Sequence, residues 1–140
     1  MFLTEDEVKF ANLIGSKRNS TNRKLQVTDS RYKRTDPLEI DQLGARAELV
    51  IHKFCNQYPE EMFMFKPLSK ANKTDLGDIF IEGLGVDVKA TKYKTGKLLA
   101  NIGPIPDIAI FGLIIENNIN EYDLKGFMTA HDLYDEKRIE

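Results

Sequence analysis

Cysteine, histidine and tryptophan are scarce in this chain, and their scarcity excludes several kinds of site. The 140 residues contain one cysteine, Cys55, two histidines and no tryptophan. A structural zinc site needs four Cys or His ligands and a disulfide needs two cysteines, so neither is expected. A single cysteine is typical of a reducing compartment, and we therefore expect a cytoplasmic protein.

Long apolar runs are also missing. The longest run, Ile108–Ile115, has eight residues, which is too short to cross a membrane and typical of a buried strand. The N-terminus carries acidic residues rather than a basic region before an apolar stretch, so we expect no secretory signal and no membrane partner. A hydrophobic content of 41% with 30% charged residues indicates one globular unit.

Two carboxylates and an ammonium group gather within residues 78–89. Two short β-branched and aromatic runs flank a Gly-rich turn here, which predicts a hairpin. Strand periodicity of two places Asp87 and Lys89 on one face. A two-residue turn at Gly83-Leu84 pairs Asp78 with Lys89 and adds Asp78 to that face. Two interpretations stay open at this point: an ordinary solvated hairpin, or a site for a divalent cation.

A long helix is predicted before the hairpin. Asp36 is a suitable N-cap, Pro37 suits the first helical position, and Glu39 completes a capping-box spacing. A stripe of apolar residues at helical spacing should pack on the sheet, and it consists of Leu43, Ala47, Val50, Ile51, Phe54 and Cys55. Glu48 falls at the margin of this stripe. We expect it to lean over the sheet face that carries Asp87 and Lys89.

Taken together, Glu48, Asp78 and the triplet Asp87-Val88-Lys89 resemble the PD-(D/E)xK nuclease superfamily. Its pattern is a glutamate on the first core helix, then an aspartate, then D/E-x-K on adjoining strands. The resemblance covers residues 36–133 and extends to small prokaryotic and phage members. The proline that names the motif is absent, and Asp75 is a second, less favoured choice for the first strand aspartate.

The resemblance implies a catalytic domain that hydrolyses phosphodiester bonds of DNA with Mg²⁺ or Mn²⁺. Asp78, Asp87 and the carbonyl of Val88 would hold the metal, and Lys89 would orient the attacking water. Glu48 would act through water or help to hold a second metal. The implied fold is α/β, with a mixed central sheet flanked by helices in a restriction-endonuclease-like core of α-β-β-β-β order.

Positive charge is concentrated between residues 17 and 34, where seven Lys and Arg face only Asp29. This polar segment is either an arm that lies along DNA phosphates or a solvated connector without a partner. Three more lysines follow the predicted hairpin and extend the positive surface. The candidate DNA-binding residues are Arg18, Arg23, Lys24, Arg31, Lys33, Arg34, Lys92, Lys94 and Lys97.

The remaining chain completes a single core preceded by a basic arm. We expect residues 1–35 to form a helix ending near Gly15 and then the arm, and residues 36–140 to form the nuclease-like core. Residues 61–65 read as the first core strand. Residues 108–115 and 122–128 read as antiparallel strands, and Thr129 is the expected cap of a short final helix.

The expected function is a metal-dependent DNA endonuclease, with a homodimer as the simplest way to cut both strands. An exonuclease or a structure-selective resolvase on the same core is the alternative enzyme. A non-catalytic nucleic-acid-binding or assembly protein that retains the fold is the alternative of a different class.

Overall fold

Helices and a mixed sheet make up the described part of the protein. The computed structural model describes residues 1–24, 36–57, 59, 62, 79–97 and 108–133, with side chains of residues 22–24 excepted. Its elements, in chain order, are α1 (Glu5–Lys24), α2 (Pro37–Phe54), β1 (Ile79–Ile81), β2 (Leu84–Thr91), β3 (Ile110–Asn118), β4 (Glu121–Thr129) and α3 (Ala130–Leu133). The prediction of an α/β fold with a mixed central sheet and helices is confirmed.

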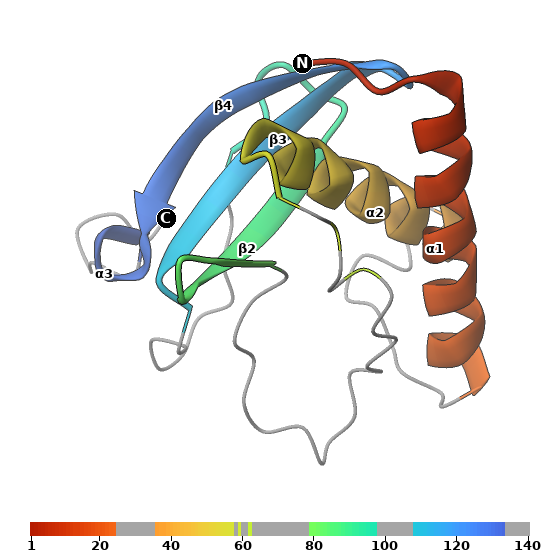
Figure 1. Cartoon of the computed structure of the whole chain (residues 1–140), viewed down its shortest axis with the longest axis horizontal. Coiled ribbons are helices and arrows are strands. Elements are labelled where there is room, and N and C mark those ends of the chain that lie inside the picture. The colour runs from red at the N-terminus through yellow and green to blue at the C-terminus, as the bar shows by residue number, and fades with distance from the viewer. Residues whose placement is uncertain (25–35, 58, 60–61, 63–78, 98–107, 134–140) are drawn as a thin grey trace.

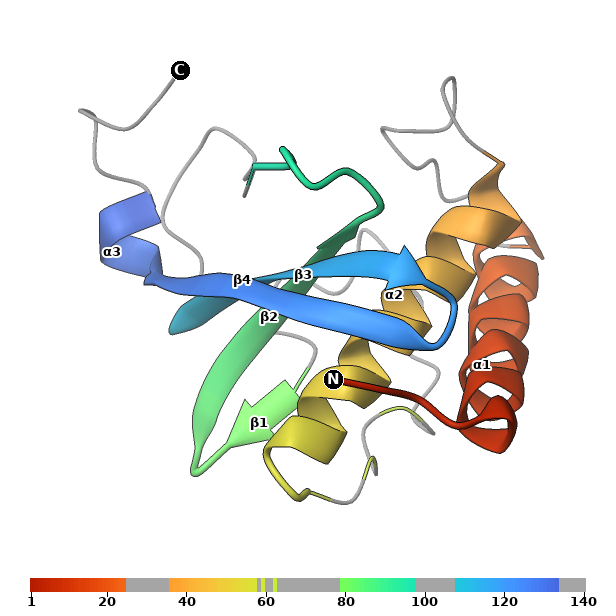
Figure 2. The ribbon, with the colours of Figure 1, turned by 90° about the horizontal axis from the view of Figure 1, so that it is seen from above.

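The sheet has the strand order β1-β2-β3-β4, and its middle pair is parallel. β1 with β2 and β3 with β4 are antiparallel. Figures 1 and 2 show α2 between the sheet and α1, so the helices form two successive layers on one side. The short α3 lies at the other end of the sheet from α1.

The main core lies where α2 covers the sheet. Val50 and Ile51 of α2 are buried there in one cluster with Val86, Val88 and Ile114. Residues 86, 88 and 114 belong to the same sheet face, because β2 and β3 pair in register with Ala90 opposite Ile114. The apolar face of the sheet therefore carries α2, and the alternate residues of β2 point to the other face.

The start of α2 agrees with its sequence signals. The amide N–H of Leu38 donates to Oδ1 of Asp36 at 3.0 Å, and Pro37 is the first helical residue. Glu39 does not close a capping box; its carboxylate pairs with Lys92 instead. The apolar stripe is only partly confirmed, since Phe54 is 58% exposed.

Helix α1 begins as expected but ends nine residues later than expected. Thr4 and Glu7 form a reciprocal capping box, with backbone-to-side-chain distances of 2.8 and 3.2 Å. The prediction of an end near Gly15 is wrong because this glycine marks a helix crossing. A Cβ built on Gly15 would lie 2.5 Å from the Cα of Gln42 in α2. Gly15 therefore lets the two helix backbones approach closely.

Alanine should have opposite effects on the free energy of unfolding at the two helical glycines. We expect Gly15→Ala to lower the free energy of unfolding by about 1–3 kcal/mol, because its methyl group collides with the backbone of α2. Gly44 has nothing within 4 Å of a built Cβ, so Gly44→Ala should raise stability by up to about 1 kcal/mol. Urea denaturation of both variants checks this pair, and a change of the same sign in both would contradict it.

Much of the predicted basic arm is helical. Arg18, Arg23 and Lys24 belong to α1, so the interpretation of residues 17–24 as a loop is wrong. The cause is the packing of α1 on α2, which a polar composition does not reveal. Three other candidates for DNA binding lie outside the described residues: Arg31, Lys33 and Arg34.

The β1–β2 hairpin forms with a different turn. Ile81 pairs with Leu84, so the turn residues are Glu82 and Gly83, whose φ angles are 50° and 82°. Positive φ at both positions is typical of a type I′ turn, whereas the expected turn was at Gly83-Leu84. The predicted register is wrong by two residues. A shift of two keeps every side chain on its predicted face.

The prediction of the last two strands is confirmed, whereas that of a strand at residues 61–65 is not. β3 and β4 are antiparallel neighbours, and the amide N–H of Asp132 donates to Oγ1 of Thr129, the expected cap of α3. Within residues 61–65 only Met62 is described, and it lies in a helical turn with its N–H bonded to the Pro59 carbonyl at 3.2 Å. Among the described residues, no helix is long and apolar enough to span a bilayer.

Candidate functional site

Asp87 and Lys89 meet on the face of β2 opposite α2. The Nζ atom of Lys89 lies 2.8 Å from Oδ2 of Asp87, which confirms that they share a face. The Asp87 side chain is 9% exposed and that of Lys89 is 44% exposed. A buried carboxylate is thus joined to a solvent-accessible ammonium group two residues along the same strand.

Asp87 retains capacity for another ligand. Its Oδ2 atom is buried and makes no geometrically acceptable hydrogen bond within the described part of the chain, despite the short ionic contact with Lys89. Val86 pairs with Ile79, the first residue of β1, so Asp87 lies one residue beyond the last described pair of this hairpin. The Lys89 ammonium already compensates this buried charge, and a carboxylate oxygen has a second lone pair that a cation or a polar ligand can use.

Glu48 is buried in α2 and held by Arg18 from the C-terminal half of α1. The guanidinium group donates to both carboxylate oxygens, and the Nη2–Oε1 distance is 3.1 Å. Burial raises the pKa of Glu48, Arg18 opposes this rise, and the negative charge of Asp87 adds to it. Glu48 and Asp87 are therefore close enough for their charges to interact.

The two carboxylates do not share one sheet face. Helix α2 covers the face of Val86 and Val88, whereas Asp87 and Lys89 point to the other face. The expectation that Glu48 leans over the face of Asp87 and Lys89 is therefore wrong. The physical reason is that the apolar stripe of α2 packs on the apolar side of β2, which leaves Glu48 at the margin of that side.

The raised pKa of Glu48 predicts a pH-dependent stability. Its ordinary pKa is 4.5, and a carboxyl group with a raised pKa binds a proton more readily when folded. Its stabilising contribution is therefore complete below pH 4.5 and is lost as the pH rises through its folded pKa. Glu48→Gln stays neutral, so its unfolding free energy relative to the original protein should increase from about pH 4 to pH 7. Urea denaturation across this range checks the trend, and a flat or falling difference would contradict it.

The other candidate residues are distributed unevenly. Lys92 lies just after β2 and pairs with Glu39, whose pKa its hydrogen bond lowers. Lys94 and Lys97 are exposed in the turn that follows. Arg23 and Lys24 form the last turn of α1. The two alternative first aspartates, Asp75 and Asp78, lie outside the described residues.

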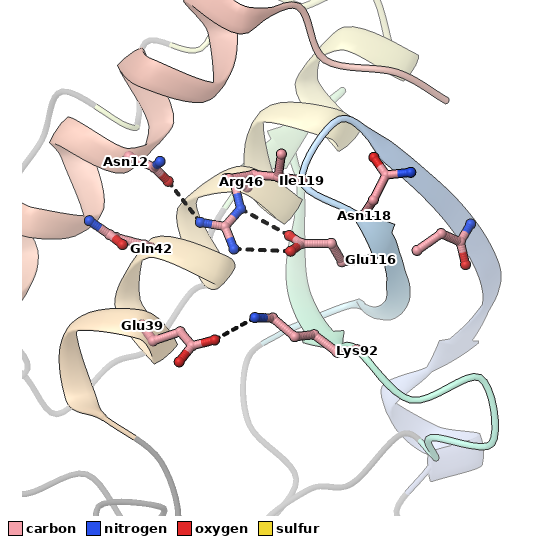
Figure 3. Close-up of a pocket in the computed structure, with 9 residues that line it drawn as sticks. Asn12, Glu39, Gln42, Arg46, Lys92, Glu116, Asn118 and Ile119 are labelled. Atoms are coloured by element: carbon pink, nitrogen blue, oxygen red, sulfur yellow. Dashed lines mark hydrogen bonds and ion pairs between the residues drawn. The ribbon is translucent and has the colours of Figure 1, made fainter.

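A buried ion pair on the α2 side of the sheet was missed by the sequence analysis. Nε and Nη2 of Arg46 donate to Glu116 at 2.9 and 3.1 Å, and Nη1 donates to Asn12 at 2.7 Å (Figure 3). Both charged side chains are about 5% exposed or less. The available signal was Glu116 at the end of the apolar run Ile108–Ile115. An acidic group in line with a buried strand needs a buried cation.

Asp87 and Glu48 have the chemical type of ligand that binds a hard divalent cation. Carboxylate oxygens are the ligands that Mg²⁺ and Mn²⁺ prefer, and one or two of them with water can suffice for Mg²⁺. Asp87 offers the buried oxygen described above, and its charge acts on Glu48. Within the described ranges, no three Asp, Glu, His or Cys side chains converge on one point.

Comparisons with known proteins give no family for this chain. No protein-family model matches it, and neither the curated proteins nor the solved structures include a similar one.

Proposed function

We propose that the protein is a metal-dependent DNA endonuclease of the PD-(D/E)xK type, with a restriction-endonuclease-like core resembling small prokaryotic and phage members. The observation that carries the proposal is Asp87, a buried carboxylate that pairs at 2.8 Å with a lysine two residues later on the same strand face. The preceding helix contributes Glu48, a second buried carboxylate whose pKa responds to Asp87. This order of groups is the superfamily pattern.

In the proposed reaction each residue has a separate task. Asp78, Asp87 and the Val88 carbonyl would hold a divalent cation, which would supply positive charge for the phosphoryl group in the transition state. Glu48 would act through water or help to hold a second cation. Lys89 donates a hydrogen bond to a water molecule and aligns it for attack on phosphorus. Asp87 holds the lysine ammonium at 2.8 Å on the same strand face. The new P–O bond forms from water, which gives up a proton to solvent. The ester P–O bond breaks, and the leaving oxygen takes up a proton from solvent.

DNA would be bound by the basic residues around this site. Lys92, Lys94 and Lys97 follow β2 directly and are exposed, so phosphate groups can reach them. Such contacts release counterions and make binding dependent on salt concentration. Two copies acting together would cut both strands, and a free thiol at Cys55 suits a cytoplasmic location.

A second candidate function is supported by Arg18. Its guanidinium group neutralises Glu48 without any metal, as expected of a protein that keeps the fold but binds nucleic acid without cleaving it. Exonuclease or resolvase activity would use the same residues as the endonuclease and differs only in the DNA substrate.

Plasmid cleavage separates these functions. Supercoiled plasmid incubated with the protein in Mg²⁺ or Mn²⁺ should become nicked, and EDTA should prevent nicking. Linear, single-stranded and branched DNA in parallel reactions identify exonuclease and resolvase activities. Salt-sensitive binding without cleavage of any of these DNA forms would refute the nuclease proposal in favour of the binding protein.

A further inference from the structure

A polar pocket lies at the carboxyl ends of the two parallel strands. Its volume is about 500 Å³, and its walls come from both long helices, the residues after β2 and the β3–β4 turn (Figure 3). Lys92 follows β2 and Glu116 lies near the end of β3, so both strands deliver residues to it. Ligands of open α/β sheets bind preferentially at the carboxyl ends of parallel strands.

At the floor of the pocket, charged side chains of the protein already pair with each other. Arg46 and Glu116 form the buried bidentate pair described above, and Asn12 accepts a third hydrogen bond from Arg46. Separating this pair would leave a buried charge without a partner, which is expensive. A ligand therefore meets a neutral, rigid floor rather than a free arginine.

The rim offers one cation that can change partner. Lys92 and Glu39 are about half exposed, with side-chain exposures of 46% and 48%, and their ion pair lines the pocket (Figure 3). Exposed pairs of this kind contribute little stability, so an anionic ligand can replace Glu39 as the partner of Lys92 with little loss of stability. Glu39 would then repel additional negative charge. The pocket thus suits a ligand with a single anionic group.

The rest of the lining suits a flat, hydrogen-bonding group. Asn12, Gln42 and Asn117 bring carboxamides, each with one polar atom already bonded within the protein: Oδ1 of Asn12 accepts from Arg46, Nε2 of Gln42 donates to Ser16 and Nδ2 of Asn117 donates to Asp123. The other polar atom of each carboxamide can pair with the edge of a nucleobase. Ile119 is 45% exposed at the pocket and supplies an apolar surface for a ring. The volume exceeds what a phosphate ion or a small sugar phosphate needs.

We propose that this pocket binds a nucleoside monophosphate, with the phosphate on Lys92 and the base among the carboxamides. The ligand can be a free nucleotide or the terminal nucleotide of a DNA strand, because both present the same groups. Binding here does not require the metal or the cleavage reaction. If the proposed nuclease function holds, the site would favour strand ends near the catalytic residues.

Titration with dAMP tests the pocket without measuring activity. In ¹⁵N–¹H spectra recorded in EDTA, dAMP should shift the side-chain amide signals of Gln42 and Asn12. Lys92→Ala should weaken dAMP binding by about tenfold or more, since a charge-assisted hydrogen bond is lost. Lys9→Ala, which removes an exposed lysine of α1 outside the pocket, is the matched control and should bind like the original protein.

Titration with compounds that represent parts of dAMP shows which groups the pocket recognises. Deoxyadenosine, ribose 5-phosphate and inorganic phosphate should each bind more weakly than dAMP. A single-stranded oligonucleotide with a terminal phosphate that competes with dAMP would identify strand ends as a source, whereas no competition would restrict the site to free nucleotides. Absence of dAMP-induced shifts at Gln42 and Asn12, or equal binding by Lys92→Ala, would overturn the proposal even if the protein cleaves plasmid.

Discussion

Asp87→Asn is expected to reduce DNA cleavage by about 10³-fold, because the variant loses the charge that holds a cation and positions Lys89. Asparagine has nearly the same shape as aspartate, so the fold should persist. Lys89→Ala should cause a comparable loss while leaving metal binding in place, since the lysine acts on water rather than on the cation. The measurement is the initial rate of plasmid nicking in Mg²⁺.

The matched control for this prediction is Asp123→Asn. Asp123 is an exposed aspartate of β4 whose carboxylate accepts a hydrogen bond from Asn117, and it has no place in the proposed reaction. Its substitution should leave the nicking rate near that of the original protein. Cleavage that survives both Asp87→Asn and Lys89→Ala would remove these two residues from the mechanism.

Glu116→Gln is expected to cause the largest loss of stability, about 3–5 kcal/mol, by leaving Arg46 buried without a counter-charge. That is a large part of the 5–15 kcal/mol that typically stabilises a domain, so the variant should be marginally folded. The same network includes Tyr122, whose pKa is raised by burial and by the nearby charge of Glu116. The measurement is the unfolding free energy from urea denaturation.

A double variant shows whether stability is lost because a buried charge is unpaired or because the packing has changed. Arg46→Met with Glu116→Leu removes both charges and should recover most of the stability lost by Glu116→Gln alone. Glu39→Gln, which affects the exposed pair with Lys92, should leave the unfolding free energy nearly unchanged. A double variant as unstable as the single one would contradict the account of the buried pair.

Local signals in the sequence predicted the elements but not their packing. Asp36 and Pro37 located the start of α2, and Thr129 was recognised as the cap of α3, because caps depend on a few neighbouring residues. Gly15 was misread as a helix end, since only the position of α2 shows that it serves a close crossing. The same limit hid Arg46 and Glu116, which are 70 residues apart.

The contact between Asp87 and Lys89 could be predicted from the sequence, but the position of Glu48 could not. Alternation alone places Asp87 and Lys89 together, and their contact follows from it. The position of Glu48 depends on which face of the sheet receives α2, and that is decided by the apolar side chains of residues 86, 88 and 114. Arg18 could not be matched to Glu48 from the sequence, because the length of α1 determines where Arg18 lies.

Binding of Mn²⁺ tests the central claim most directly, because Asp87 has its proposed role only if a cation binds there. Titration of Mn²⁺ followed by electron paramagnetic resonance should detect a bound ion in the original protein. Asp87→Asn should lose this site, while Asp123→Asn should retain it. Mn²⁺ binding that is undetectable in the original protein, or unchanged in Asp87→Asn, would contradict the account.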